Sequence, residues 1–134
     1  MQTANKPGAE TAKTAALRLK GWEKAYPMRL SIDAFEKIAQ KLPEDQQDAR
    51  HILALIGDTS AACEIACLLM QAAADGEPVP TVDDIKKAEM RELENIRRMC
   101  LLAMLQGFGI ESKNIDEDVD EALMQKEKNA EKGG

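Results

Sequence analysis

The clearest helical pattern in this 134-residue chain is Asp58-Thr-Ser-Ala-Ala-Cys-Glu-Ile-Ala-Cys-Leu-Leu-Met-Gln-Ala-Ala-Ala74. Its apolar side chains recur at helical spacing, and they are Ala62, Ile65, Ala66, Leu68, Leu69 and Ala72. Asp58-Thr59-Ser60 is a capping cluster in front of the helix, and Gly76 follows its end. These signals predict a strong helix from Ala61 to Ala74.

Other helices are predicted on both sides of this one. Ser31 is placed to cap a helix that stops at Pro43, and an apolar run over residues 49–56 ends at Gly57. Thr81 is placed to cap the longest helix, which we expect over residues 82–106. We also expect a short basic helix over residues 15–24. Aromatic residues make up only 3% of the chain, so the core is expected to be aliphatic and the fold mostly α-helical.

The charge is unevenly distributed along the chain. Residues 1–42 carry a net charge of +4 and residues 43–134 a net charge of −10, which together give the −6 of the whole chain. A basic first third suits contact with a polyanion, whereas the acidic remainder would repel one. An ordinary solvated surface with no functional meaning is the competing interpretation.

The cysteine count and the shortness of the apolar runs both favour a cytoplasmic location. The three cysteines Cys63, Cys67 and Cys100 are an odd number in a chain that is not cysteine-rich, which favours free thiols in a reducing environment. The first 16 residues contain no apolar run of a secretory signal, and no stretch reaches the ~20 apolar residues that span a bilayer. We therefore expect a cytoplasmic protein that does not insert into membranes.

No motif indicates an enzyme, a cofactor or a metal. Cys63 and Cys67 lie four residues apart, and with His51 and Cys100 they have the composition of a zinc site. Small buried thiols in a helical core are the commoner explanation of that spacing. The acidic run around Asp116–Asp120 lacks the glycine and the closing glutamate of a calcium-binding loop. A small enzyme or metal protein therefore stays the third hypothesis.

Self-association is predicted from the second half of the chain. After Met99 the predicted helix is apolar nearly all round, and a chain this short has little else to cover it. We expect a dimer or tetramer whose interface includes Leu93, Ile96, Cys100, Leu101, Leu102 and Ala103.

The first half has the order of a ribbon-helix-helix DNA-binding unit. Pro27 favours an extended segment over residues 26–30, and two capped helices follow. In such a unit two chains pair their ribbons, and the ribbon pair enters the major groove. Met28 and Leu30 would then face inward at the dimer interface. The expected DNA-binding residues are Arg18, Lys20, Lys24, Arg29, Thr59 and Ser60, the last two gripping phosphate at a helix N-terminus.

Three stretches resemble the TraM relaxosome proteins of F-like conjugative plasmids. Residues 29–39 (RLSIDAFEKIA) resemble the ribbon and first helix, residues 59–69 (TSAACEIACLL) the second DNA-binding helix, and residues 93–105 the tetramerising helical hairpin. The resemblance implies a tetramer that binds DNA near a transfer origin and recruits the transfer machinery. The proline at position 27, inside the extended segment expected as the ribbon, departs from this pattern because it lacks a ladder donor.

The sequence therefore predicts four regions and leaves two main functions open. The regions are a flexible basic arm with a short helix (1–25), a DNA-binding region (26–76), a helical oligomerisation region (81–110) and an acidic amphipathic tail (111–134). The first function is an oligomeric DNA-binding accessory protein or repressor, in plasmid conjugation if the resemblance holds. The alternative is a homodimeric helical adaptor or chaperone that binds a protein partner and no nucleic acid.

Overall fold

The protein is mostly helical with a small two-stranded sheet. The computed structural model describes residues 14–110, so the predicted arm before residue 14 and the acidic tail from residue 111 lie outside the described residues. The elements in chain order are β1 (Ala16–Leu17), β2 (Tyr26–Pro27), α2 (Ile32–Ala39), η1 (Glu44–Gln46), α3 (Ala49–Leu55), α4 (Thr59–Ala74), α5 (Val82–Lys86), η2 (Met90–Glu92) and α6 (Leu93–Gly107).

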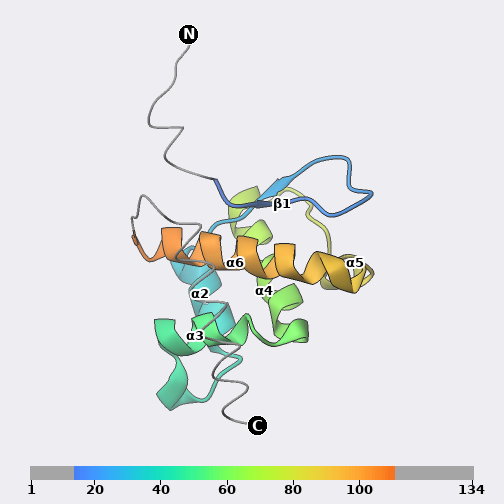
Figure 1. Cartoon of the computed structure of the whole chain (residues 1–134). Helices are drawn as coiled ribbons and strands as arrows, with labels where there is room; N and C mark the ends of the chain where they lie inside the picture. Colours follow the sequence, from blue (N-terminus) through green and yellow to red (C-terminus); the bar gives the residue numbers. More distant parts are fainter. Residues whose placement is uncertain (1–13, 111–134) are drawn as a thin grey trace.

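Helix α4 is the centre of the fold. It contacts α2, α5, α6 and β2, and α6 runs across it (Figure 1). Seven of its residues are buried, and they are Ala62, Cys63, Ile65, Ala66, Cys67, Leu69 and Met70. These residues lie on most sides of α4, and each side is buried by a neighbouring element. A helix that is apolar on most sides needs such surroundings.

Local capping rules set the helix boundaries. The side chains of Ser31, Asp58 and Thr81 accept backbone hydrogen bonds at the N-termini of α2, α4 and α5. Thr81 and Asp84 form a reciprocal capping box, with N–H to oxygen distances of 3.1 and 2.9 Å. The capping cluster before α4 and the two other predicted caps are therefore confirmed.

The short helix predicted over residues 15–24 is wrong. The chain instead forms a hairpin in which Ala16 pairs with Pro27 and Leu17 with Tyr26 in an antiparallel register. Leu17 and Leu19 are buried while Arg18 and Lys20 are exposed, which is the two-residue alternation of a strand. Gly21 has a φ of +92°, a conformation that glycine adopts readily and that suits the turn of the hairpin.

The continuous helix predicted over residues 82–106 is also wrong, because the chain breaks at Glu89. That residue is extended, with φ −73° and ψ 155°, and it separates α5 from η2 and α6. A straight helix over this range would be about 37 Å long, whereas the 16 residues of α4 span about 24 Å. The break lets α5 and α6 both pack against α4, so burial outweighs the helical preference of the local sequence.

The end of α6 is closed by a Schellman motif. The N–H of Ile110 bonds to the carbonyl of Leu105 and that of Gly109 to the carbonyl of Gln106, both at 3.0 Å. Gly109 has the positive φ of +75° that this motif requires. Nearby, the rings of Phe35 and Phe108 meet edge to face at 5.9 Å and join α2 to this end of α6. The chain therefore leaves the axis of α6 after Gly109.

Candidate protein-binding groove

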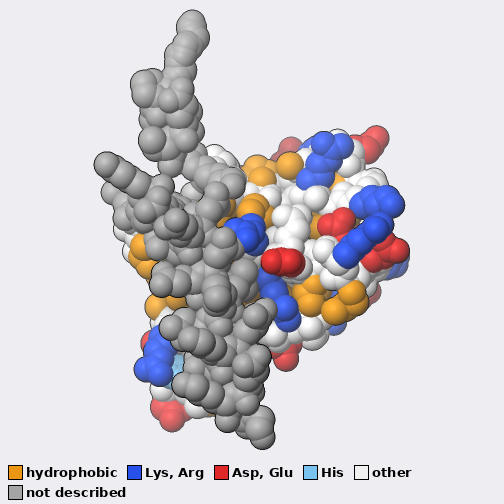
Figure 2. Space-filling model, viewed as in Figure 1, with side chains coloured by type: hydrophobic (Ala, Val, Ile, Leu, Met, Phe, Trp, Pro, Cys, Tyr) orange, Lys and Arg blue, Asp and Glu red, His pale blue; other side chains and the backbone are white. Residues whose placement is uncertain are grey.

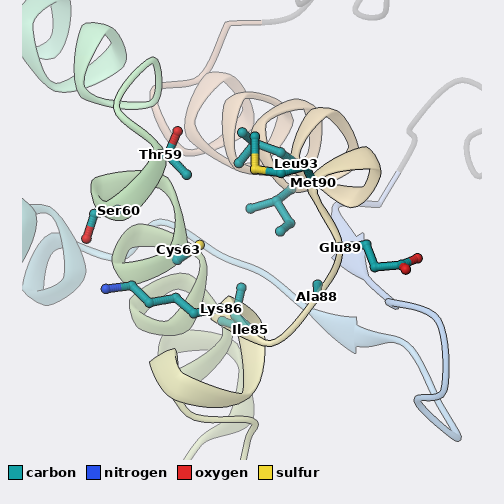
Figure 3. A pocket seen from close by; sticks show the side chains of 10 residues that line it. Thr59, Ser60, Cys63, Ile85, Lys86, Ala88, Glu89, Met90 and Leu93 are labelled. Atoms are coloured by element: carbon teal, nitrogen blue, oxygen red, sulfur yellow. The ribbon is translucent and has the colours of Figure 1, made fainter.

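An open groove lies where α5 gives way to α6, against the first turns of α4 (Figure 3). Its volume is about 350 Å³, near the lower end of the range for ligand pockets and large enough for an anchoring side chain. The lining side chains come from three helices and the linker between two of them. They are Thr59, Ser60, Cys63, Ile85, Lys86, Ala88, Glu89, Met90, Leu93 and Ile96.

The floor of the groove is apolar and belongs to the core. Cys63, Ile85, Leu93 and Ile96 are each at most 7% exposed. Ile85 is placed by the capping box that starts α5, and Leu93 and Ile96 lie on the first turns of α6. The floor is therefore held by well-packed helices and does not depend on a ligand to form.

Met90 stands at the rim with 73% of its surface exposed. It occupies the first position of η2, directly after the break at Glu89. A large apolar side chain on the surface is informative when it adjoins further apolar surface, as here. Methionine is unbranched and polarisable, so it adapts to partners of different shape.

The rim also carries polar groups and one cation. Thr59 and Ser60 are exposed on the first turn of α4, and Lys86 extends along the same side of the groove (Figure 3). Glu89 points its carboxylate away from the groove, and that carboxylate pairs with Arg91 at 2.7 Å. Lys86 is therefore the charged side chain that a ligand in the groove would meet.

The thiol of Cys63 lies close enough to Lys86 to feel its charge. Burial raises the pKa of Cys63, the Lys86 ammonium acts in the opposite direction, and Glu64 adds a smaller upward effect. Since burial has the largest effect, Cys63 stays a protonated thiol at neutral pH. It serves the groove as a small apolar wall and has no features of an activated nucleophile.

The residues predicted to bind DNA do not form one surface. Arg18, Lys20 and Lys24 are exposed on the β1–β2 hairpin. Arg29 instead donates from Nη2 to the carbonyl oxygen of Ala72 at 2.9 Å, near the C-terminus of α4. Thr59 and Ser60 begin that same helix, about 20 Å away along its axis. The structure therefore separates Arg29 from Thr59 and Ser60, the two residues predicted to grip phosphate.

The hairpin cations have partial partners within the chain. Nε of Arg18 donates to the carbonyl oxygen of Trp22 at 3.1 Å, and the ammonium of Lys24 lies 5.0 Å from the ring centroid of Tyr26.

The end of the molecule that carries α5 shows basic and acidic side chains side by side (Figure 2). Mixed charge of this kind gives no single-sign field over that face.

The predicted interface residues are covered within one chain. Met28, Leu93, Ile96, Cys100, Leu101, Leu102 and Ala103 are all at most 7% exposed, and Leu30 is partly buried. Helix α6 buries its apolar end against α4 and β1. The expectation that the chain itself has little to cover this helix end is therefore wrong, although self-association stays a prediction. Leu93 and Ile96 line the floor of the groove.

The residues considered for metal binding are dispersed. His51 pairs through Nδ1 with the carboxylate of Asp48 at 2.9 Å, at the start of α3. Cys63, Cys67 and Cys100 are free and buried. Over residues 14–110, no cluster of His, Cys, Asp or Glu has the arrangement of a metal site.

The helices were also compared with membrane-spanning helices, and the chain with known proteins. No single helix within residues 14–110 is long and apolar enough to cross a membrane. Taken together, α3 and α4 have the required length and apolar content, but a bend of 112° lies between them. Comparison of the chain with protein-family models, with curated proteins and with solved structures found no match.

The groove was only partly visible in the sequence. Thr59, Ser60, Leu93 and Ile96 were singled out there, but for DNA and for self-association. Met90 and Lys86 were missed because the predicted continuous helix gave them no special place. The one signal in the sequence was a methionine among charged neighbours, and an isolated methionine of this kind is common on surfaces.

Proposed function

We propose that this protein is a helical adaptor that binds a segment of another protein through the groove between α4, α5 and α6. The observation that carries the proposal is the apolar floor next to an exposed methionine. Anchoring side chains bury themselves in pockets of this kind, and a polar rim then fixes the orientation of the segment. The expected partner segment carries a large apolar anchor, with acidic residues that approach Lys86.

Selection of peptides from a displayed random library on the immobilised full chain tests this proposal. We expect enriched peptides with apolar residues at helical spacing and with acidic flanks. Met90→Asp should weaken their binding about ten-fold or more, which corresponds to about 1.4 kcal/mol. Ile32→Asp is the matched control, because Ile32 is 83% exposed and does not line the groove. Peptides that bind Met90→Asp and the natural chain equally would contradict the proposal.

A second candidate is DNA binding through the hairpin, as an accessory protein or repressor. Its support is the group of exposed cations Arg18, Lys20 and Lys24, beside the half-buried aromatic pair Trp22 and Tyr26. The ribbon-helix-helix arrangement needs residues 26–30 of two chains to pair, whereas β2 pairs with β1 of its own chain. A DNA complex of the TraM type would therefore require the hairpin to open or its free edge to be used.

A mobility-shift titration with mixed duplex DNA at two salt concentrations tests the second candidate. Phosphate contacts would make the affinity fall steeply with added salt. A triple variant, Arg18→Gln with Lys20→Gln and Lys24→Gln, should then abolish the shift, whereas Met90→Asp should leave it unchanged. Absence of a shift at low salt would remove DNA binding from consideration. The mass of the free chain in solution, measured first, decides whether a dimer or tetramer exists.

A further inference from the structure

The groove would fit a ligand that is both apolar and negatively charged. Its floor needs an apolar side chain, and Lys86 at its rim has no ion-pair partner among residues 14–110. Glu89, an acidic residue that lines the groove, is already paired with Arg91. Asp58, at the N-cap of α4, accepts the backbone N–H of Ala61 at 2.8 Å. A segment that combines apolar anchors with free carboxylates would satisfy both needs of the groove.

The sequence of the chain contains such a segment. Residues 115–126 read IDEDVDEALMQK, with five acidic residues between positions 116 and 121. Ile115, Val119, Ala122 and Leu123 recur at the i, i+4, i+7 and i+8 spacing of one helix face. Apolar anchors and negative charge are therefore combined within one short stretch.

The segment is long enough to reach the groove of its own chain. Helix α6 extends about 21 Å from Leu93, in the groove, to Gly107. The Schellman motif at Gly109 turns the chain off the axis of α6. The five residues from Glu111 to Ile115 span about 17 Å when extended, and one helical turn from Ile115 to Val119 would add about 6 Å, so Val119 can return along the length of α6 to the groove.

Covalent attachment favours this occupant over a free one. A short tether gives a linked segment an effective concentration in the millimolar range. A segment with even millimolar affinity for the groove therefore occupies it for much of the time. A partner protein at micromolar concentration must bind far more tightly to displace it.

We propose that residues 115–126 occupy the groove of their own chain and compete there with the protein partner. The competition rests on the proposed function of the groove, whereas occupation of the groove by the segment does not. Val119 and Leu123 are the anchors, and the acidic residues lie against Lys86. Removal of these anchors opens the groove to the partner.

Photo-crosslinking in the full chain tests the occupation. A benzophenone amino acid at position 90, which is highly exposed, should form a crosslink to residues 115–126 of the same chain, located by mass spectrometry of the peptides. The same probe at the exposed position 44, outside the groove, is the control and should give no such product. A product of twice the chain mass that joins position 90 to the tail of a second copy would overturn occupation within one chain.

The double variant Val119→Asp with Leu123→Asp tests the competition. It should abolish the crosslink from position 90 and raise the affinity of a library-selected peptide about five-fold. A crosslink from position 90 that persists in the double variant, or that maps outside residues 115–126, would overturn the proposal. Lys86→Glu should also reduce the crosslink yield, because it repels the acidic residues.

The two proposals fail in different ways. If selected peptides bind the groove but no crosslink to the tail appears, the self-occupation is wrong and the adaptor function stands. If the crosslink appears but the double variant still selects no peptides, the tail is the sole ligand of the groove and the adaptor function is wrong. Crosslinking of the position 90 probe to a bound selected peptide shows that the probe is competent.

Discussion

Gly107 lies so close to Leu30 that a Cβ at position 107 would stand 2.5 Å from the Cβ of Leu30 and 3.1 Å from its carbonyl oxygen. This contact joins the last turn of α6 to the extended segment that follows β2. It explains why a glycine is found inside a helix, where alanine is ordinarily preferred.

Gly107→Ala should therefore destabilise the protein, by about 1–3 kcal/mol, although alanine favours helices. The backbone at Leu30 would have to move, and it cannot move freely because the N–H of Arg29 bonds to the carbonyl of Leu69 at 3.0 Å. Urea denaturation followed by circular dichroism measures the effect. Glu94→Ala, an exposed change in the same helix, is the control, and equal stability of the two variants would contradict the contact.

Arg29→Ala should lower stability by about 1 kcal/mol, because the guanidinium caps a carbonyl near the C-terminus of α4. A cation there also suits the negative end of the helix dipole. Arg29→Lys should keep part of this stability. If Arg29→Ala leaves the denaturation midpoint unchanged but weakens a DNA complex, the residue contacts DNA as the sequence suggested, and its intramolecular bond is unimportant.

The stability of the α5 cap should depend on pH. The backbone N–H of Thr81, and then its hydroxyl, hold the pKa of Asp84 below the ordinary value of 3.8. A carboxyl with a depressed folded pKa stabilises the fold above its unfolded value, and that contribution is lost as the pH falls below 3.8 through the folded value. Melting temperatures between about pH 6 and pH 2 should therefore fall less steeply in Asp84→Asn.

Asparagine is a suitable replacement because it keeps an acceptor oxygen but cannot ionise. Asp83→Asn, which changes the neighbouring acid outside the capping box, is the matched control. If the melting temperature of Asp84→Asn depends on pH as steeply as that of the natural chain, the capping box does not link the stability of the fold to pH.

Leu102→Asp should unfold the chain, because Leu102 is 1% exposed within a single copy. The buried, unpaired charge should cost about 4 kcal/mol or more. Met90→Asp adds the same group at an exposed site and should remain folded. If Leu102→Asp yields a folded protein of smaller mass, the segment is an interface between copies, as first expected from the sequence.

The starts of the helices could be predicted from the sequence where a local capping bond sets them. Capping by Ser31, Asp58 and Thr81 uses hydrogen bonds across three residues, so the residue order alone predicts it. The helical spacing of apolar residues over 61–74 likewise predicted the helix that the structure has as α4. The alternation of Leu17 and Leu19 with Arg18 and Lys20 indicated a strand, and it was misread as a helix because the stretch is short and ambiguous.

The candidate site depends on how the helices pack against one another. Residues 82–106 favour a continuous helix by local propensity, and the break at Glu89 arises because α5 and α6 both gain burial against α4. The groove beside Met90 is a consequence of that break, so no local pattern encodes it. The mostly helical fold and the helix caps follow from hydrogen bonds between near neighbours in the sequence, so the residue order predicts them. Which residues meet in the groove follows from the packing of α5 and α6 against the same apolar helix, which no local pattern records.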